Sequence, residues 1–248
     1  MPLVGTRPVT ALEGGPLVTD LQSERLELPG CGILQIMYEI DAEGVQALIP
    51  PALHPTVPAT VVFTVWNVPE SPAGAFVVAE AKIGCRSGAR PRGLLVRGFC
   101  SSAEGTAFLS SKWGYPVTQA NVSLTKRYDR IRGVAESGGN TLLDITLLNP
   151  EPIAGNDIQY LANLNVARLD REGATVARLI QSDPDYVFRS ADRGKPEMSV
   201  FDADAFGLGG AHAYFPVSAS YAVADINMPE VRYLVDPSKS PLASVERL

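Results

Sequence analysis

The stretch LSSKWGYPVTQANVSL, residues 109–124, predicts a strand, a tight turn and a second strand. Gly114-Tyr115-Pro116 forms the turn, because glycine and proline interrupt regular structure. The strands predicted on either side cover residues 106–113 and 122–128. Lys112 therefore lies on the strand that enters the turn, and Val117 and Thr118 follow directly after it.

The rest of the chain repeats this rhythm of short strands and turns. Twenty prolines and 22 glycines punctuate segments rich in β-branched residues, which is typical of strands joined by turns. The further predicted strands are residues 33–40, 60–68, 75–85, 93–101, 132–136, 141–148, 158–169, 175–182, 186–190, 214–226 and 231–234. A short helix after Asp41 is expected to stop at Pro50-Pro51. We expect a mainly β (α+β) fold in a single domain, residues 1–248, whose first 20 residues form an extended arm.

Composition excludes several classes of function. The chain has 248 residues, of which 46% are apolar and 19% charged, and its net charge is −6. The 21 lysines and arginines form no dense block, which argues against a nucleic-acid partner. No run of about 18 apolar residues is present to span a bilayer, and the first residues do not read as a signal peptide. We expect a cytoplasmic protein with no membrane partner.

The cysteines and histidines predict neither a disulfide framework nor a metal site. Cys31, Cys85 and Cys100 are an odd number at wide spacings, whereas zinc sites need closer pairs. We expect three reduced, mostly buried thiols, no metal and no cofactor.

Three segments in the same order resemble the acetoacetate decarboxylase-like superfamily. The first is MYEIDAEGVQALIPPAL, residues 37–53; the second is the GYP turn; the third is the closing segment, residues 201–236. The resemblance runs from about residue 33 to residue 236. It implies an antiparallel β-barrel or cone with few short helices, enclosing an apolar pocket, in a protein that is usually a homo-oligomer.

The chain departs from that family at the reactive position. In the family the turn is followed by two lysines, the first of which forms a Schiff base with the substrate carbonyl. Val117 and Thr118 stand there instead, so these two residues are expected to line the pocket without forming an imine. Lys112 lies five residues upstream, about 16 Å away along an extended strand. It is either a solvated lysine or a relocated amine.

The strand predicted at residues 75–85 carries two charged candidates. Glu80 matches the family's pocket glutamate, and the alternation of a strand places Lys82 on the same face. The two side chains can form an acid–base pair, or Lys82 can be an amine displaced onto this strand. The alternative is an ion pair on a solvated face.

Other candidates surround this pair. Tyr115 can donate a hydrogen bond to a substrate carbonyl or developing oxyanion, or it is a packed turn aromatic. Arg97 interrupts an apolar segment, where it binds a carboxylate or enolate or faces solvent. Thr64 can hold a substrate oxygen. The remaining predicted binding residues, which either line the pocket or have other structural roles, are Trp66, Phe99, Trp113 and His212.

These patterns leave three functions open. The first is an enzyme that enolises, dehydrates, isomerises or cyclises a carbonyl compound without an imine, in natural-product, polyketide-like metabolism. The second is a Schiff-base lyase, a decarboxylase or aldolase-dehydratase, that uses Lys82 or Lys112. The third is a non-catalytic protein that binds a small molecule. The partner in each case is a small-molecule substrate or ligand.

Overall fold

The computed structural model describes residues 3–88, 90–171 and 173–248, and it is mainly β as the sequence predicts. The elements within these residues are η1 (Val9–Leu12), β1 (Leu26–Ile40), α1 (Val45–Leu48), β2 (His54–Pro55), β3 (Thr60–Val68), β4 (Phe76–Ser87), β5 (Arg90–Cys100), α2 (Ala103–Trp113), β6 (Val117–Gln119), β7 (Asn121–Lys126), β8 (Arg130–Ser137), β9 (Asn140–Pro152), η2 (Gly155–Asp157), β10 (Asn163–Arg171), β11 (Ala174–Ser182), β12 (Asp185–Phe201), β13 (Ala213–Met228), β14 (Tyr233–Val235) and β15 (Val245–Arg247).

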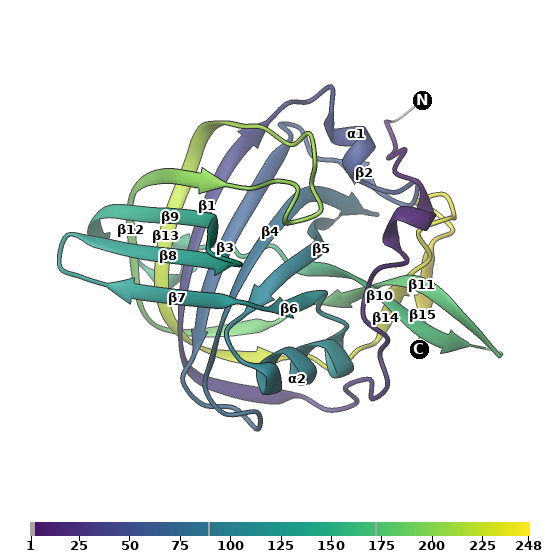
Figure 1. Cartoon of the computed structure of the whole chain (residues 1–248), viewed down its shortest axis with the longest axis horizontal. Coiled ribbons are helices and arrows are strands. Elements are labelled where there is room, and N and C mark those ends of the chain that lie inside the picture. The colour runs from purple at the N-terminus through teal and green to yellow at the C-terminus, as the bar shows by residue number, and fades with distance from the viewer. Residues whose placement is uncertain (1–2, 89, 172) are drawn as a thin grey trace.

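All strands of the described residues belong to one sheet. Its order is β15-β14-β11-β10-β5-β4-β3-β1-β13-β12-β9-β8-β7, with β2 beside β4 and β6 beside β5. Most neighbours are antiparallel, but β5 pairs in parallel with both β10 and β6. The sheet is open, and β7 to β9 fold over the face of β3 and β4, as Figure 1 shows.

Two apolar cores lie on the two faces of the central strands. Val61, Phe63 and Val65 of β3 pack with Ile131 and Ile145 from the folded-over strands. The opposite face of the same strands packs against α2 and the carboxyl end of β13 in a second cluster. The strands β3 and β4 are consequently buried on both sides, with nearly every residue shielded from water.

The strand predicted at residues 106–113 is wrong, because these residues belong to α2. The Ser102 side chain accepts a hydrogen bond from the Gly105 backbone N–H at 2.9 Å and so caps the helix. Gly114 ends it with a left-handed φ of 64°, a conformation that glycine adopts without strain. The predicted strand at residues 158–169 begins only at Asn163, and residues 158–162 form a segment outside the strands.

The N-terminal segment is hydrogen-bonded to residues near α1 and to β10. Backbone N–H groups of Gly5 and Arg7 donate to the carbonyls of Leu53 and Ile49 beside α1. Further along, Val18 donates to the carbonyl of Arg168 on β10. The segment therefore bridges α1 and β10, and its Leu12 side chain is buried in the apolar core.

The three cysteines of the described residues are free and buried, as expected. Burial raises the pKa of Cys31 and of Cys85 to about 12. Within the described residues no helix is both long enough and apolar enough to cross a bilayer.

The contact between β8 and β3 depends on a glycine, and this gives a stability test. A Cβ added to Gly133 would lie 2.7 Å from the Cγ2 of Val65. We expect Gly133→Ala to lower the free energy of unfolding by about 1–3 kcal/mol through overpacking. Urea denaturation measures the loss.

Gly44→Ala is the matched control, because an added Cβ there meets nothing within 4 Å. Its effect should stay within about 0.5 kcal/mol. Equal effects of the two substitutions would contradict the close packing of β8 on β3.

Candidate active site

Glu80 and Lys82 lie side by side on β4, on the face that meets α2 and β10. Only 2% of Glu80 and 4% of Lys82 is exposed. The ammonium Nζ of Lys82 is 3.1 Å from Oε2 of Glu80. The two residues thus share a face, as the alternation predicts, and that face is buried rather than solvated.

Asn163 at the start of β10 completes a triangle with this pair. Lys82 Nζ donates to Asn163 Oδ1 at 3.0 Å, and Asn163 Nδ2 donates to Glu80 Oε1 at 3.3 Å. The Asn163 amide therefore forms a hydrogen bond with each member of the pair. These bonds offset part of the cost of burying two charges, which is high unless the charges are paired and hydrogen-bonded. Gly93 lies opposite on β5, where an added Cβ would be 2.9 Å from the Lys82 Cβ, so the glycine leaves room for the lysine stem.

The sheet register brings the residues matched by family resemblance into one row. Thr64 on β3 pairs with Glu80, Glu80 pairs with Gly98 on β5, and Gly98 pairs with Val117 on β6. Directly paired residues point to the same side of a sheet. Val117 accordingly packs in the apolar cluster that contains Tyr115 and Trp66.

Tyr115 is held over this row by the end of α2. Its backbone N–H donates to the Leu109 carbonyl at 3.2 Å, and its own carbonyl accepts from the Ser110 hydroxyl at 2.8 Å. Burial, followed by the negative charge of Glu80, holds the pKa of the Tyr115 phenol above its ordinary value. The phenol is consequently a protonated hydrogen-bond donor at neutral pH.

The pair opens onto a small, mostly apolar cavity, here named the Glu80–Lys82 cavity. Its volume is about 30 Å³, well below the roughly 300–1,000 Å³ of small-molecule sites. The lining residues are Ile33, Thr64, Trp66, Glu80, Lys82, Tyr115, Tyr160, Asn163, Pro184, Tyr186, Ile226 and Met228. The cavity is therefore narrow beside the ion pair, with room for a small reacting group.

Two hydroxyls of this cavity have no hydrogen-bond partner among the described residues, Thr64 Oγ1 and the Tyr160 phenol. Buried polar atoms nearly always form hydrogen bonds, so a buried hydroxyl without one is unusual. Both belong to residues that line the cavity, where a bound molecule with oxygen or nitrogen atoms would satisfy them.

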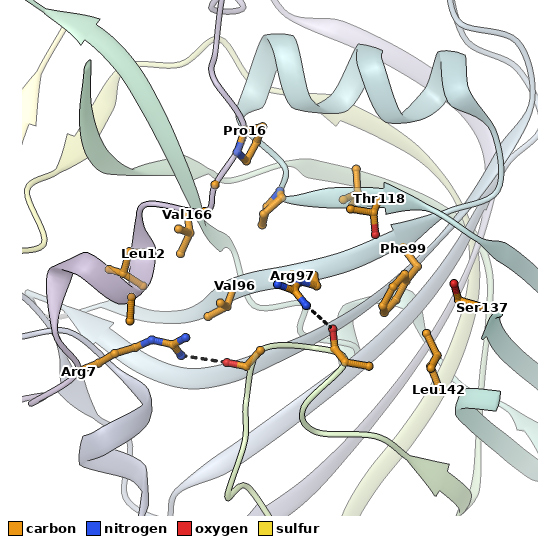
Figure 2. A pocket seen from close by; sticks show the side chains of 17 residues that line it. Arg7, Leu12, Pro16, Val96, Arg97, Phe99, Thr118, Ser137, Leu142 and Val166 are labelled. Carbon is orange, nitrogen blue, oxygen red and sulfur yellow. Dashed lines mark hydrogen bonds between the residues drawn. The ribbon is translucent and has the colours of Figure 1, made fainter. Parts of the chain in front are cut away.

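The structure divides the predicted site residues between two places. Glu80, Lys82, Tyr115, Thr64 and Trp66 line the Glu80–Lys82 cavity. Four others line a second cavity of about 580 Å³ (Figure 2), namely Arg97, Phe99, Val117 and Thr118. The β5 strand has an irregular register here, since Glu80 pairs with Gly98 but Lys82 pairs with Leu95. Arg97 directly precedes Gly98, the partner of Glu80, so the alternation of the strand points it away from Glu80.

The remaining predicted residues lie outside both cavities. Lys112 is on the last turn of α2 and donates to Asp20 at 2.8 Å on the surface. Trp113 is fully buried, and its indole N–H donates to the Pro229 carbonyl at 2.7 Å. His212 is exposed in the loop before β13. Lys112 therefore forms a surface ion pair with Asp20 from the end of α2 and does not line the cavity that contains Glu80.

Sequence reasoning missed Asn163, Tyr160 and Tyr186. The sequence does contain an indication of Asn163: two amide side chains, Asn163 and Asn165, interrupt the apolar residues of β10. Both are buried in the structure. The tyrosines come from segments without a motif and meet only in the fold, with ring centroids 4.7 Å apart. Among the described residues no three metal-ligating side chains converge.

Comparison with known proteins identifies the fold. The family model described as acetoacetate decarboxylase matches residues 16–205. The crystal structure of acetoacetate decarboxylase from Legionella pneumophila is similar with a TM-score of 0.73 and 17% identity, covering 87% of this chain and 88% of that chain. The enduracididine biosynthesis enzyme MppR complexed with pyruvate has a TM-score of 0.68 and 13% identity, covering 87% and 91%.

An acetoacetate decarboxylase-like enzyme from Sphingomonas wittichii RW1 has a TM-score of 0.65 and 14% identity, covering 86% of this chain and 92% of that chain. No curated protein sequence matches the chain. At these identities the structural similarities establish the fold.

The burial of the ion pair predicts an asymmetric response to substitution. Lys82→Met leaves Glu80 buried without its cation and should cost about 3–5 kcal/mol of unfolding free energy. The double variant Glu80→Leu/Lys82→Met removes both charges and should recover most of that loss. Urea denaturation of the three proteins measures the coupling.

The surface pair Arg130–Asp129 is the control, because its side chains are 51% and 52% exposed. Arg130→Met should cost no more than about 1 kcal/mol. If Lys82→Met costs as little, the pair is not buried as described.

The unpaired Tyr160 phenol predicts a pH effect. Burial raises its pKa, as it raises the pKa of Tyr186, so above about pH 10 the unfolded chain loses the proton before the folded one. Stability therefore falls as pH rises beyond 10. Tyr160→Phe should leave stability at pH 7 nearly unchanged and make the alkaline decline shallower, by up to about 1.4 kcal/mol per pH unit.

Denaturation at a series of pH values from 7 to 11 tests this, with Tyr128→Phe as the control. Tyr128 is fully exposed, and its replacement should leave the wild-type decline in place. An unchanged slope in Tyr160→Phe would contradict a buried phenol at this position.

Proposed function

The chain belongs to the acetoacetate decarboxylase family, and we propose that it is an enzyme that enolises a small carbonyl compound in the Glu80–Lys82 cavity. In this proposal Glu80 removes a proton from the carbon next to the carbonyl. The Lys82 ammonium and the Tyr115 phenol donate hydrogen bonds to the oxygen that becomes the enolate. One observation carries the proposal: a carboxylate and an ammonium 3.1 Å apart line the same small, mostly apolar cavity.

The charge balance of the buried pair favours this reaction. Before proton transfer the site holds one carboxylate and one ammonium. Afterwards Glu80 is neutral, and the ammonium faces a negative enolate oxygen in its place. The net charge of the site is unchanged, so no new uncompensated charge is created where water is excluded. Donors fixed in a dry site stabilise such developing charge effectively.

The lining suggests what kind of molecule reacts. Ile33, Trp66, Ile226 and Met228 supply apolar walls, while Thr64 and Tyr160 offer unpaired hydroxyls. The cavity of about 30 Å³ admits a short group, so a longer polyketide-like substrate would require the walls at Tyr160 and Pro184–Tyr186 to move apart. Isomerisation, loss of water or ring closure would follow from the enolate in a natural-product pathway. The similar structure MppR is described as a biosynthesis enzyme and holds pyruvate.

A second candidate is imine formation by Lys82, because Glu80 lies close enough to take the ammonium proton. The amine would then attack the carbonyl carbon, and water would leave as the imine forms. This is the Schiff-base alternative with the amine on β4 instead of the β6 turn.

Assembly and location are part of the proposal. Tyr214, Phe215 and Val217 of β13 are exposed, and neighbouring exposed apolar side chains often mark contacts between proteins. We propose a homo-oligomer through this face. The buried, unpaired cysteines fit a reducing compartment such as the cytoplasm.

Proton exchange tests the enolisation. With butanone and 2-oxobutanoate in D₂O, the wild-type protein should speed the replacement of hydrogen by deuterium next to the carbonyl, followed by NMR. Glu80→Gln should slow this exchange by at least about 100-fold, the usual contribution of a positioned base. Glu70→Gln is the control, because Glu70 is an exposed loop residue.

Borohydride added during the same incubations separates the two candidates. The enolisation mechanism predicts no reduced adduct, whereas the imine mechanism predicts one on the Lys82 peptide, detected by mass spectrometry. A protein that binds either ketone but neither exchanges nor traps it would contradict both and leave a binding function.

A further inference from the structure

The second cavity, defined by Arg7, Arg97 and the loop at residues 205–207 and here named the two-arginine cavity, takes no part in the proposed reaction. It lies on the opposite face of β5 from the Glu80–Lys82 cavity. The N-terminal segment, β5, β6 and the 205–207 loop surround it, as Figure 2 shows. Its volume of about 580 Å³ falls within the range of small-molecule sites, roughly 300–1,000 Å³.

Both guanidinium groups reach the same loop (Figure 2). Arg7 Nη1 donates to the Gly207 carbonyl at 3.1 Å and to the Leu48 carbonyl at 3.3 Å. Arg97 Nη1 donates to the Ala205 carbonyl at 3.4 Å. Because these loop residues are two apart in sequence, their Cα atoms are at most about 7 Å apart. The positively charged side chains of Arg7 and Arg97 therefore both bind the loop at residues 205–207.

Neither charge meets a carboxylate within the described parts of the chain. The arginine ion pairs there involve Arg25, Arg92, Arg130, Arg132, Arg171, Arg178, Arg189, Arg193 and Arg232. Arg7 is partly buried, and burial lowers its pKa from the ordinary value. Each guanidinium has five N–H donors and uses only Nη1 in the hydrogen bonds described. Donors remain free for an anion.

The rest of the lining is suited to an apolar body. Leu12, Val96, Phe99, Leu142 and Val166 form the walls, while hydroxyls of Thr118 and Ser137 lie at the same cavity. Arginine forks match the planar oxygens of carboxylates and the oxygens of phosphates. We propose that the two-arginine cavity is a second ligand site, which binds a small organic oxyanion with a hydrocarbon body. Carboxylate and phosphate share the required chemistry, and the experiment separates them.

Such a ligand would lie against the turn that carries Tyr115. Pro116, Val117 and Thr118 line the two-arginine cavity and directly follow Tyr115, which lines the other cavity. The two cavities thus share one turn as a wall, although their chemistry differs.

Isothermal titration calorimetry with three eight-carbon probes tests the proposal. Octanoate and octyl phosphate carry the anion, and octanol has the same chain without charge. We expect saturable binding of at least one anion, with octanol at least about tenfold weaker, since hydrogen bonds to charged groups are worth roughly 1.5–3 kcal/mol. The ratio of the two anion affinities shows which headgroup the site prefers.

Two variants locate the binding. Arg97→Ala removes one charge, and Thr118→Trp fills the cavity from an exposed position on β6. Each should weaken binding of the preferred anion at least about tenfold. Arg90→Ala is the matched control, an exposed arginine of the same strand that lines neither cavity, and it should change the affinity less than twofold. Circular dichroism confirms that the variants are folded.

The proposal is overturned if neither anion binds saturably or if octanol binds as tightly as the anions. It is also overturned if Arg97→Ala and Thr118→Trp behave like Arg90→Ala. Glu80→Gln separates this site from the proposed active site: it should leave anion binding unchanged. Tighter anion binding in that variant, as expected at an ammonium freed from its carboxylate, would instead place the anion in the Glu80–Lys82 cavity and refute a second site.

Discussion

Two ionisable side chains of β4 lie where water is excluded, and the local structure is arranged around their charges. Glu80 and Lys82 are almost completely buried, so the solvation they lose must be replaced by each other and by Asn163. The ammonium also needs space for its stem, which Gly93 provides. A buried pair of this kind is weak evidence for added stability, because desolvation offsets much of the attraction. Its position beside an apolar cavity with unpaired hydroxyls is the basis of the proposed chemistry.

Much of the fold could be predicted from the sequence, and the main error has an identifiable cause. The observed bounds of β3 match the prediction, because a short run rich in β-branched and aromatic residues favours a strand. The wrong prediction is the strand at residues 106–113, which rests on the resemblance of the turn that follows to the family's strand and turn. Helix signals were nevertheless present: Ser102 as a cap, Gly114 as a stop, and apolar residues at Gly105, Phe108 and Leu109 on one side.

The candidate site was predictable in part. Alternation along β4 places Glu80 and Lys82 on one face, but it cannot say that this face is buried, because both faces of β4 are covered by the fold. Alternation from Gly98, the partner of Glu80, places Arg97 and Phe99 on the side of the other cavity, but the sequence alone does not show which residue of β5 pairs with Glu80. Tyr160 and Tyr186 reach the site through long-range contacts, which a single sequence does not reveal.

The central claim is that the Glu80–Lys82 pair is the reacting centre, and the structure of a complex tests it most directly. A crystal structure with butanone or 2-oxobutanoate should show the ligand carbonyl oxygen within hydrogen-bond distance of Lys82 Nζ, with the adjacent carbon facing the Glu80 carboxylate. Density for the ligand only in the two-arginine cavity, with none in the Glu80–Lys82 cavity, would contradict the account.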